Sequence, residues 1–227
     1  MKYVVLFFIF QIISNQVISK KDINFPFQKE CIKSYLGNIE ICLPEINGMT
    51  ECYKKTNIKP RVDEFKVQGN TIHAYYLNDS IFNIIDGLQN LVMTDVFKVY
   101  SINETHSMPI SFEELNQIFD LMTKEYMKNI IDTASIDFSL KFKNINFSNP
   151  VVIKIYKPSK NIKTALTLIK SYYAGKESVN IMSYSLVAVK KRLLFYSYYL
   201  KYNDIESINT AKERNDYYGL KLNELNK

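Results

Sequence analysis

The residues best suited to chemistry in this sequence are its two histidines, because an imidazole is the commonest general base of hydrolytic sites. His73 lies in an alternating run over residues 71–77, and His106 lies in a polar loop over residues 103–109. The nucleophile pattern Gly-x-Ser-x-Gly does not occur, so tertiary structure alone could bring a serine or cysteine to either histidine. We interpret His73 as a hydrogen-bonded sheet residue and His106 as a solvated loop residue. A hydrolase assembled from separated residues remains the alternative.

Metal and nucleotide chemistry find little support in the sequence. The two histidines do not share the spacing of four residues that places zinc ligands on one face of a helix. Glu113 and Glu114 follow Ser111, and a capping box explains them without an acid–base pair. The chain has six glycines and no glycine-rich phosphate loop. We therefore predict neither a metal site nor a cofactor.

Three cysteines lie close together in the sequence, at Cys31, Cys42 and Cys52. In an oxidising compartment two of them can form a disulfide and leave the third over. The hairpin expected around Gly37 places Cys31 diagonally beside Cys42 and not opposite it, which disfavours that pair. We therefore expect Cys52 to pair with Cys31 or with Cys42. Three buried, reduced cysteines remain the alternative.

A basic cluster followed by tyrosines is the best candidate for a binding surface. Lys190, Lys191 and Arg192 precede a strand in which Tyr196 and Tyr198 share one face. Such a face could hold a sugar or an anionic polymer, and ordinary sheet packing is the alternative. The net charge is +6, but the other lysines are scattered, so the dense basic stripe of a nucleic-acid-binding protein is missing.

The first nineteen residues predict where the protein works. Lys2 precedes an apolar run that continues to Ile13, and Val17, Ile18 and Ser19 follow as a cleavage region. The run is about half the length of a membrane span, which needs about 20 apolar residues, and no cysteine of a lipid anchor stands at its end. We expect a signal peptide over residues 1–19, cleavage after Ser19, and an extracytoplasmic protein that is secreted or periplasmic. A buried first element of a cytosolic domain is the alternative.

The remaining residues, 20–227, predict a single α+β domain with a largely antiparallel sheet. Gly37-Asn38 and Gly69-Asn70 each predict a hairpin turn. Asn78-Asp79-Ser80 offers caps for a short helix that ends near Gly87. One long amphipathic helix is expected over residues 112–131. Four or five antiparallel strands follow, over residues 136–142, 151–156, 164–173, 179–189 and 192–202. A C-terminal helix over residues 204–222 has a weaker apolar stripe and is expected on the sheet edge.

This plan, over roughly residues 39–227, resembles the α/β/α sandwich domains of the PsbP and Mog1 type. The resemblance implies binding or assembly more than catalysis, and it transfers no functional residue. We therefore expect an exported, non-enzymatic binding or interaction module, whose partner would be a protein, a peptide or an envelope polymer and not a nucleic acid. An exported hydrolase and an envelope-adhering or polysaccharide-adhering domain are the alternatives.

Overall fold

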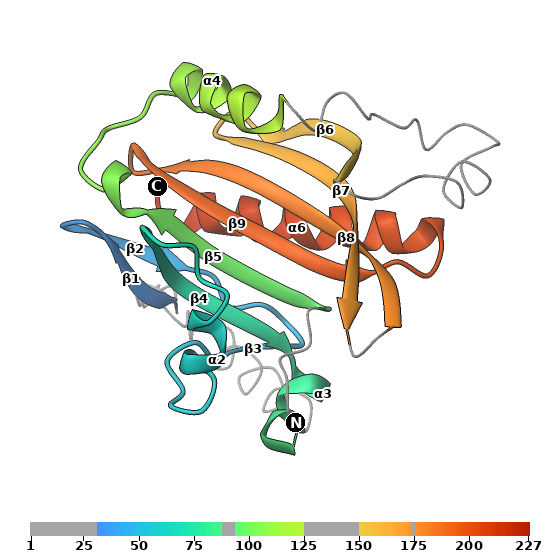
Figure 1. Cartoon of the computed structure of the whole chain (residues 1–227). Coiled ribbons are helices and arrows are strands. Elements are labelled where there is room, and N and C mark those ends of the chain that lie inside the picture. Colours follow the sequence, from blue (N-terminus) through green and yellow to red (C-terminus); the bar gives the residue numbers. More distant parts are fainter. Residues whose placement is uncertain (1–30, 88–93, 125–149, 174–175) are drawn as a thin grey trace, which may run out of the picture.

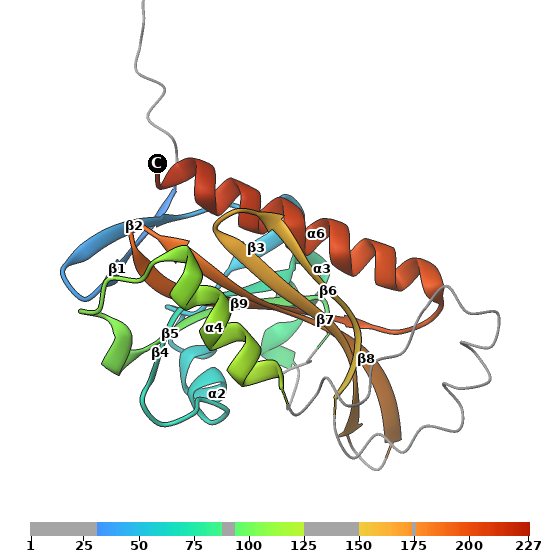
Figure 2. The same ribbon diagram turned by 90° about the horizontal axis from the view of Figure 1, so that it is seen from above.

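The computed structural model of the chain describes residues 31–87, 94–124, 150–173 and 176–227. Helix α6 (Ile205–Leu225) crosses one face of a central antiparallel sheet, and helix α4 (Phe112–Thr123) lies on the other (Figures 1 and 2). The expected α+β architecture is therefore confirmed. The signal peptide expected over residues 1–19 and a strand expected over residues 136–142 lie outside the described residues.

Seven strands form the sheet in the order β3-β4-β5-β9-β8-β7-β6, and every neighbouring pair is antiparallel. They are β3 (Met49–Glu51), β4 (Asn70–Asn78), β5 (Val96–Ile102), β6 (Val151–Ser159), β7 (Ile162–Tyr173), β8 (Lys176–Val189) and β9 (Arg192–Lys201). The last four strands follow one another in sequence and in space, as expected from their turn residues. The pairing of β9 with β5 joins them to the first half of the chain.

The first predicted hairpin is confirmed as a separate two-stranded ribbon of β1 (Ile32–Leu36) and β2 (Ile39–Leu43). Gly37 has φ +62°, which a glycine adopts without strain. Leu36, Ile41 and Leu43 pack into the same core as α6, so the ribbon covers part of the α6 face of the sheet.

The disulfide prediction is wrong, because the structure joins Cys31 to Cys42. Cys31 precedes the first residue of β1, so its backbone can turn toward Cys42 until the two Cα atoms lie 5.3 Å apart, a normal disulfide spacing. Cys52 is a free, buried thiol whose Sγ donates to the carbonyl of Tyr75 at 3.2 Å. Burial raises the pKa of Cys52 to about 12, so this thiol stays protonated and unreactive.

This pairing gives a direct chemical prediction. When the purified chain is unfolded without reductant and treated with iodoacetamide, we expect one carboxamidomethyl group, located on Cys52 by peptide mass mapping. After reduction, all three cysteines should be labelled. Label on Cys31 or Cys42 in the unreduced sample would contradict the observed pairing.

The second predicted hairpin is wrong in its first arm. Residues Lys59–Asp63 form the short helix α2, with Pro60 in its first turn, where the missing N–H of proline costs nothing. Strand β4 pairs with β3 and β5 and not with the segment before it. Beyond β4, the predicted cap is correct: Asn78 accepts from the N–H of Ser80 at the start of α3 (Asp79–Phe82), and a 3-10 turn η1 (Ile85–Gly87) follows.

Helix α4 begins where its capping box predicts. The Ser111 side chain accepts from the Glu114 N–H, and the Glu114 carboxylate accepts from the Ser111 N–H. Leu115 and Phe119 pack onto β7, β8 and β9. The predicted extension of this helix to residue 131 lies outside the described residues.

Helix α6 corrects the prediction of an edge position, because it lies across the sheet face. Its buried face carries a glycine and an amide as well as apolar residues, which explains the weak stripe. A side chain at Gly219 would overlap the hydroxyl of Tyr196 beneath it. Asn215 exchanges hydrogen bonds with Ser183 and Ser185 of β8, at 2.6 Å and 3.1 Å.

The C-terminal end of α6 is fastened to the β1–β2 ribbon by Asn226. Its side-chain amide donates to the carbonyl of Cys42 at 2.7 Å and accepts from the N–H of the same residue at 2.9 Å. The amide thus completes both main-chain hydrogen bonds that a neighbouring strand would make.

Candidate functional site

The predicted basic and aromatic residues do not form one surface. Lys190 and Lys191 are exposed at the tip of the β8–β9 hairpin, with φ of 46° and 61°, the values of a type I′ turn. Lys190 donates to the main-chain carbonyl of Glu40 at 2.8 Å, and half-buried Arg192 donates to the carbonyl of Lys191 at 3.4 Å. A role of these cations in adhesion stays a prediction.

The two tyrosines of the predicted platform are in the core, so no polymer can lie on them. Tyr196 and Tyr198 are both 0% exposed, beneath α6. Sequence alternation showed that they share a face, and the structure shows that this is the face α6 covers. The platform prediction is therefore corrected for Tyr196 and Tyr198.

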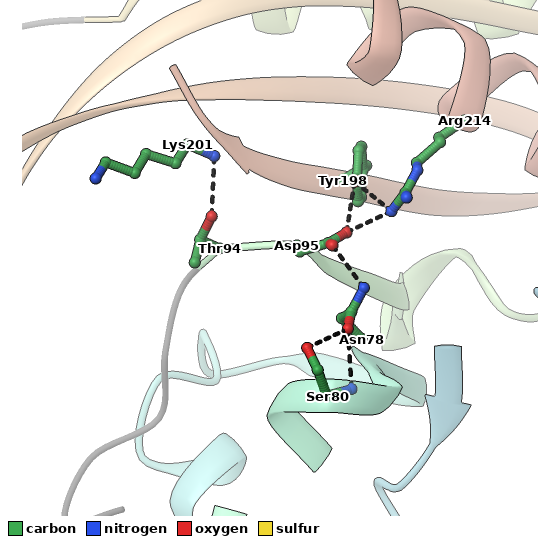
Figure 3. A network of polar contacts seen from close by, with 7 residues as sticks. All are labelled: Asn78, Ser80, Thr94, Asp95, Tyr198, Lys201 and Arg214. Carbon is green, nitrogen blue, oxygen red and sulfur yellow. Dashed lines mark hydrogen bonds and ion pairs between the residues drawn. The ribbon is translucent and has the colours of Figure 1, made fainter. Parts of the chain in front are cut away.

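Tyr198 instead belongs to a structural network (Figure 3). Its hydroxyl donates to the carboxylate of Asp95 at 2.6 Å, and Arg214 of α6 donates to the same carboxylate at 2.6 Å. The Asn78 side-chain amide donates to Asp95 at 2.8 Å. Burial and the hydrogen bond to Asp95 raise the pKa of Tyr198. These groups satisfy one another and connect β4, β9 and the residue before β5 to α6.

A cavity lies on the opposite face of the sheet, beside the C-terminal end of α4. Its volume is about 290 Å³, close to the lower limit of about 300 Å³ for ligand pockets. The walls combine tyrosines with small and apolar side chains: Tyr100, Met122, Thr123, Pro150, Val152, Ala165, Thr167, Met182, Tyr184, Ser197 and Tyr199. The sheet pairing explains the site, because Val152, Thr167, Met182 and Tyr199 form one row across β6, β7, β8 and β9.

Three tyrosines give this pocket its polar groups. Tyr100, Tyr184 and Tyr199 are partly exposed, and they come from three different strands. Burial raises the pKa of Tyr100, and hydrogen bonds to Tyr184 and Ser197 partly offset that effect. Burial also raises the pKa of Tyr199, so the hydroxyls of Tyr100 and Tyr199 are protonated at neutral pH and can donate to a ligand. The Tyr184 hydroxyl donates to Sδ of Met122 at 3.3 Å.

A half-buried lysine stands beside the pocket. Lys98 is the cross-strand partner of Ser197, and its Nζ lies 5.5 Å from the ring centroid of Tyr100. Burial lowers the pKa of Lys98. Within the described residues, no carboxylate forms an ion pair with it. The pocket therefore has a cation at its border that a negatively charged ligand could pair with.

The two histidines meet on the α6 side of the sheet. His73 Nδ1 lies 2.8 Å from Ser34 Oγ, and His73 Nε2 lies 2.6 Å from Ser101 Oγ, which is also 2.5 Å from His106 Nε2. The sheet position predicted for His73 is confirmed, whereas His106 is half-buried and bonded to Ser101. Burial lowers the pKa of His73 to about 4, with a smaller contribution from His106, and burial also lowers the pKa of His106.

Neither grouping suggests a metal centre. In the parts of the chain that the structure describes, no three His, Cys, Asp or Glu side chains are placed to hold an ion. None of the described helices is both long and apolar enough to cross a bilayer.

The sequence predicted neither the pocket nor the histidine cluster. Alternation put Tyr199 on the strand face opposite Tyr196 and Tyr198, but no spacing rule connects residues of separate strands. In comparisons with known proteins, the chain matches no family model and no curated protein. Function must therefore be inferred from these geometries.

Proposed function

We propose that this protein is an exported binding module that holds a small apolar or aromatic molecule with one negative charge in the tyrosine-lined pocket. The observation that carries the proposal is the combination of a cavity of about 290 Å³ with half-buried Lys98 at its border, which has no carboxylate partner among the residues that the structure describes. Tyrosine rings offer flat apolar area together with a hydroxyl donor, which suits a ring-shaped ligand. A buried charge is costly without a partner, so a ligand carboxylate would gain a charge-assisted hydrogen bond.

Export is part of the proposal. The amino-terminal residues 1–19 predict a signal peptide, and the Cys31–Cys42 disulfide is compatible with an oxidising compartment. The resemblance to the PsbP and Mog1 domains favours the same class of role, binding in place of catalysis.

Two fluorescent probes test the pocket and its charge separately. 8-Anilinonaphthalene-1-sulfonate carries an anion, and N-phenyl-1-naphthylamine has the same ring system without one. We expect saturable binding of both to the native protein. Lys98→Met should weaken the anionic probe about tenfold, since a charge-assisted hydrogen bond contributes about 1.5 kcal/mol or more. The same variant should leave the neutral probe within about twofold.

A matched pair of methionine substitutions locates the binding. Met182 lines the pocket, whereas Met108 is exposed on a loop outside it. Met182→Trp should fill the cavity and abolish binding of both probes, and Met108→Trp should not change it. Urea denaturation of each variant controls for native folding. Unchanged binding in Met182→Trp would overturn the proposed site.

A further inference from the structure

The cluster of Ser34, His73, Ser101 and His106 can be connected in one direction of hydrogen bonding. If the Ser34 hydroxyl donates to His73 Nδ1, neutral His73 carries its proton on Nε2 and donates it to Ser101 Oγ. The Ser101 hydroxyl then donates to Nε2 of His106. In this series each hydroxyl and each contacting ring nitrogen either donates or accepts one hydrogen bond between these residues. Ser34 contacts His73 as a base, and Ser101 and His106 continue the series beyond His73.

Strand alternation brings His73 to this cluster. Ile72 packs on the sheet face away from α6, so the next residue, His73, lies on the same face as Ser101. A β-bulge follows, because Ile72 faces Tyr100 and Ala74 faces Val99 across the ladder. His73 is the extra residue between them and has no cross-strand partner in β5.

The charge formed on removal of the Ser34 proton need not stay on buried His73. The proton moves to His73 Nδ1, the Nε2 proton of His73 moves to Ser101, and the Ser101 proton moves to His106 Nε2. The positive charge then rests on the more exposed imidazole, because His73 is 5% exposed and His106 is half-buried. The relay thus avoids the cost of an imidazolium in the interior.

The strand that carries Ser34 also offers a hydrogen-bond donor. The N–H of Cys42 donates to Asn226 and therefore points away from β1. Lys33 and Cys42 are thus a pair of facing residues that exchange no main-chain hydrogen bonds with each other. Since such pairs alternate, the Tyr35–Glu40 pair is of the same kind, and the N–H of Tyr35 points away from β2. Within the described residues β1 has no strand on that side, so this N–H can meet a developing oxyanion next to Ser34.

We propose that Ser34 is the nucleophile of an acyl-transfer site, with His73 as its base and with Ser101 and His106 as relay residues that act through His73. Uncharged, short-chain carboxylic esters are the substrate class, since the surroundings of Ser34 are half-buried and an alcohol leaves more readily than an amine. The site lies on the sheet face opposite the tyrosine-lined pocket and extends the function beyond ligand binding. Either assignment can fail without affecting the other.

The reaction balances without a further reagent. Ser34 Oγ bonds to the ester carbonyl carbon while its proton enters the relay. The bond from that carbon to the alkoxide oxygen then breaks, and the alkoxide takes a proton back from His73 to leave as the alcohol. Water repeats both steps on the acyl-serine, releasing the carboxylic acid and restoring Ser34.

The test uses the full disulfide-bonded chain, a fluorophosphonate probe and p-nitrophenyl acetate. We expect the probe on Ser34 of the wild type, identified by peptide mass mapping, and no labelling of that peptide in Ser34→Ala. Ser107, an exposed serine on the neighbouring loop, supplies the control: Ser107→Ala should label as the wild type does. Because the modified residue is mapped on the wild type, the result does not depend on a variant folding.

The relay has its own readout. Ser101→Ala should slow acylation by p-nitrophenyl acetate about 100-fold, within the range for general base catalysis. His106→Gly should be slowed similarly and should regain most of its rate in added imidazole, which a purely structural role would not produce. A native wild type that shows no label on Ser34 would overturn the nucleophile. Absence of imidazole rescue would overturn the relay.

Discussion

Replacing Gly219 by alanine should lower the free energy of unfolding by about 2 kcal/mol, although alanine is the better helix former. A Cβ at this position would overlap the Tyr196 hydroxyl and lie 3.0 Å from Cδ1 of Ile162. Overpacking of a buried site costs about 1–3 kcal/mol, and here the obstacle is a rigid ring, so we expect a value near the upper end. The helix-propensity gain of about 1 kcal/mol offsets only part of it.

The Tyr196 hydroxyl, which the new Cβ would overlap, can be removed by a separate substitution. In Tyr196→Phe the overlapping oxygen is gone, so adding Gly219→Ala to that variant should cost much less than it does in the wild type. Gly87→Ala is the matched control, because nothing lies within 4 Å of a Cβ there and the change should stay within about 0.5 kcal/mol. Urea denaturation of the four chains measures the coupling. Additive effects of the two core substitutions would contradict this packing.

Acid should destabilise the protein well above the range in which carboxylates titrate. Burial lowers the pKa of His73 from 6.5 to about 4, so the unfolded chain binds a proton more readily than the folded chain. Its contribution to stability is fully present above pH 6.5 and is lost as the pH falls toward 4. Since tenfold in proton affinity is about 1.4 kcal/mol, the loss from pH 7 should reach about 2 kcal/mol at pH 5 and about 3 kcal/mol at pH 4.

Substitution of His73 isolates this effect. His73→Gln should be less stable than the wild type at pH 7 but should lose little more between pH 7 and pH 5. His106→Gln should keep most of the pH dependence, because His106 is less buried. The carboxyls whose pKa is lowered, including Glu40 and Asp63, titrate below this window. Equal slopes in the wild type and in His73→Gln, measured by urea denaturation at each pH, would contradict the assignment.

Local signals in the sequence predicted the elements whose bonds are local. The Gly37 turn, the Asn78 cap and the Ser111 capping box each involve residues within four positions of one another, and each is confirmed. The strands after residue 150 followed from turn residues between apolar runs. The second hairpin prediction failed because the turn at Gly69 leads into β4 from the segment after helix α2 and not from a strand, and turn residues do not specify what precedes them.

The candidate sites could not be predicted from the sequence, for a different reason. Alternation separated Tyr196 and Tyr198 from Ser197 and Tyr199, but it could not say which set α6 would cover. That choice depends on α6, whose Gly219 and Asn215 look unfavourable for packing until Tyr196 and the serines of β8 are placed against them. The histidine cluster likewise combines side chains from three separate segments, β1, β4 and the end of β5 with the loop after it. A site built from side chains of separate strands produces no periodic pattern in the sequence.

The hydrogen bonds between Asn226 and Cys42 also affect the order in which the parts of the chain can fold. The two residues are 184 positions apart, so a ribosome adding about 5–20 residues per second needs roughly 10 to 40 s to supply the second after the first. During that interval the apolar side of the ribbon, with Leu36, Ile41 and Leu43, waits without the helix that will cover it. The ribbon can therefore reach its final packing only after α6 has been synthesised.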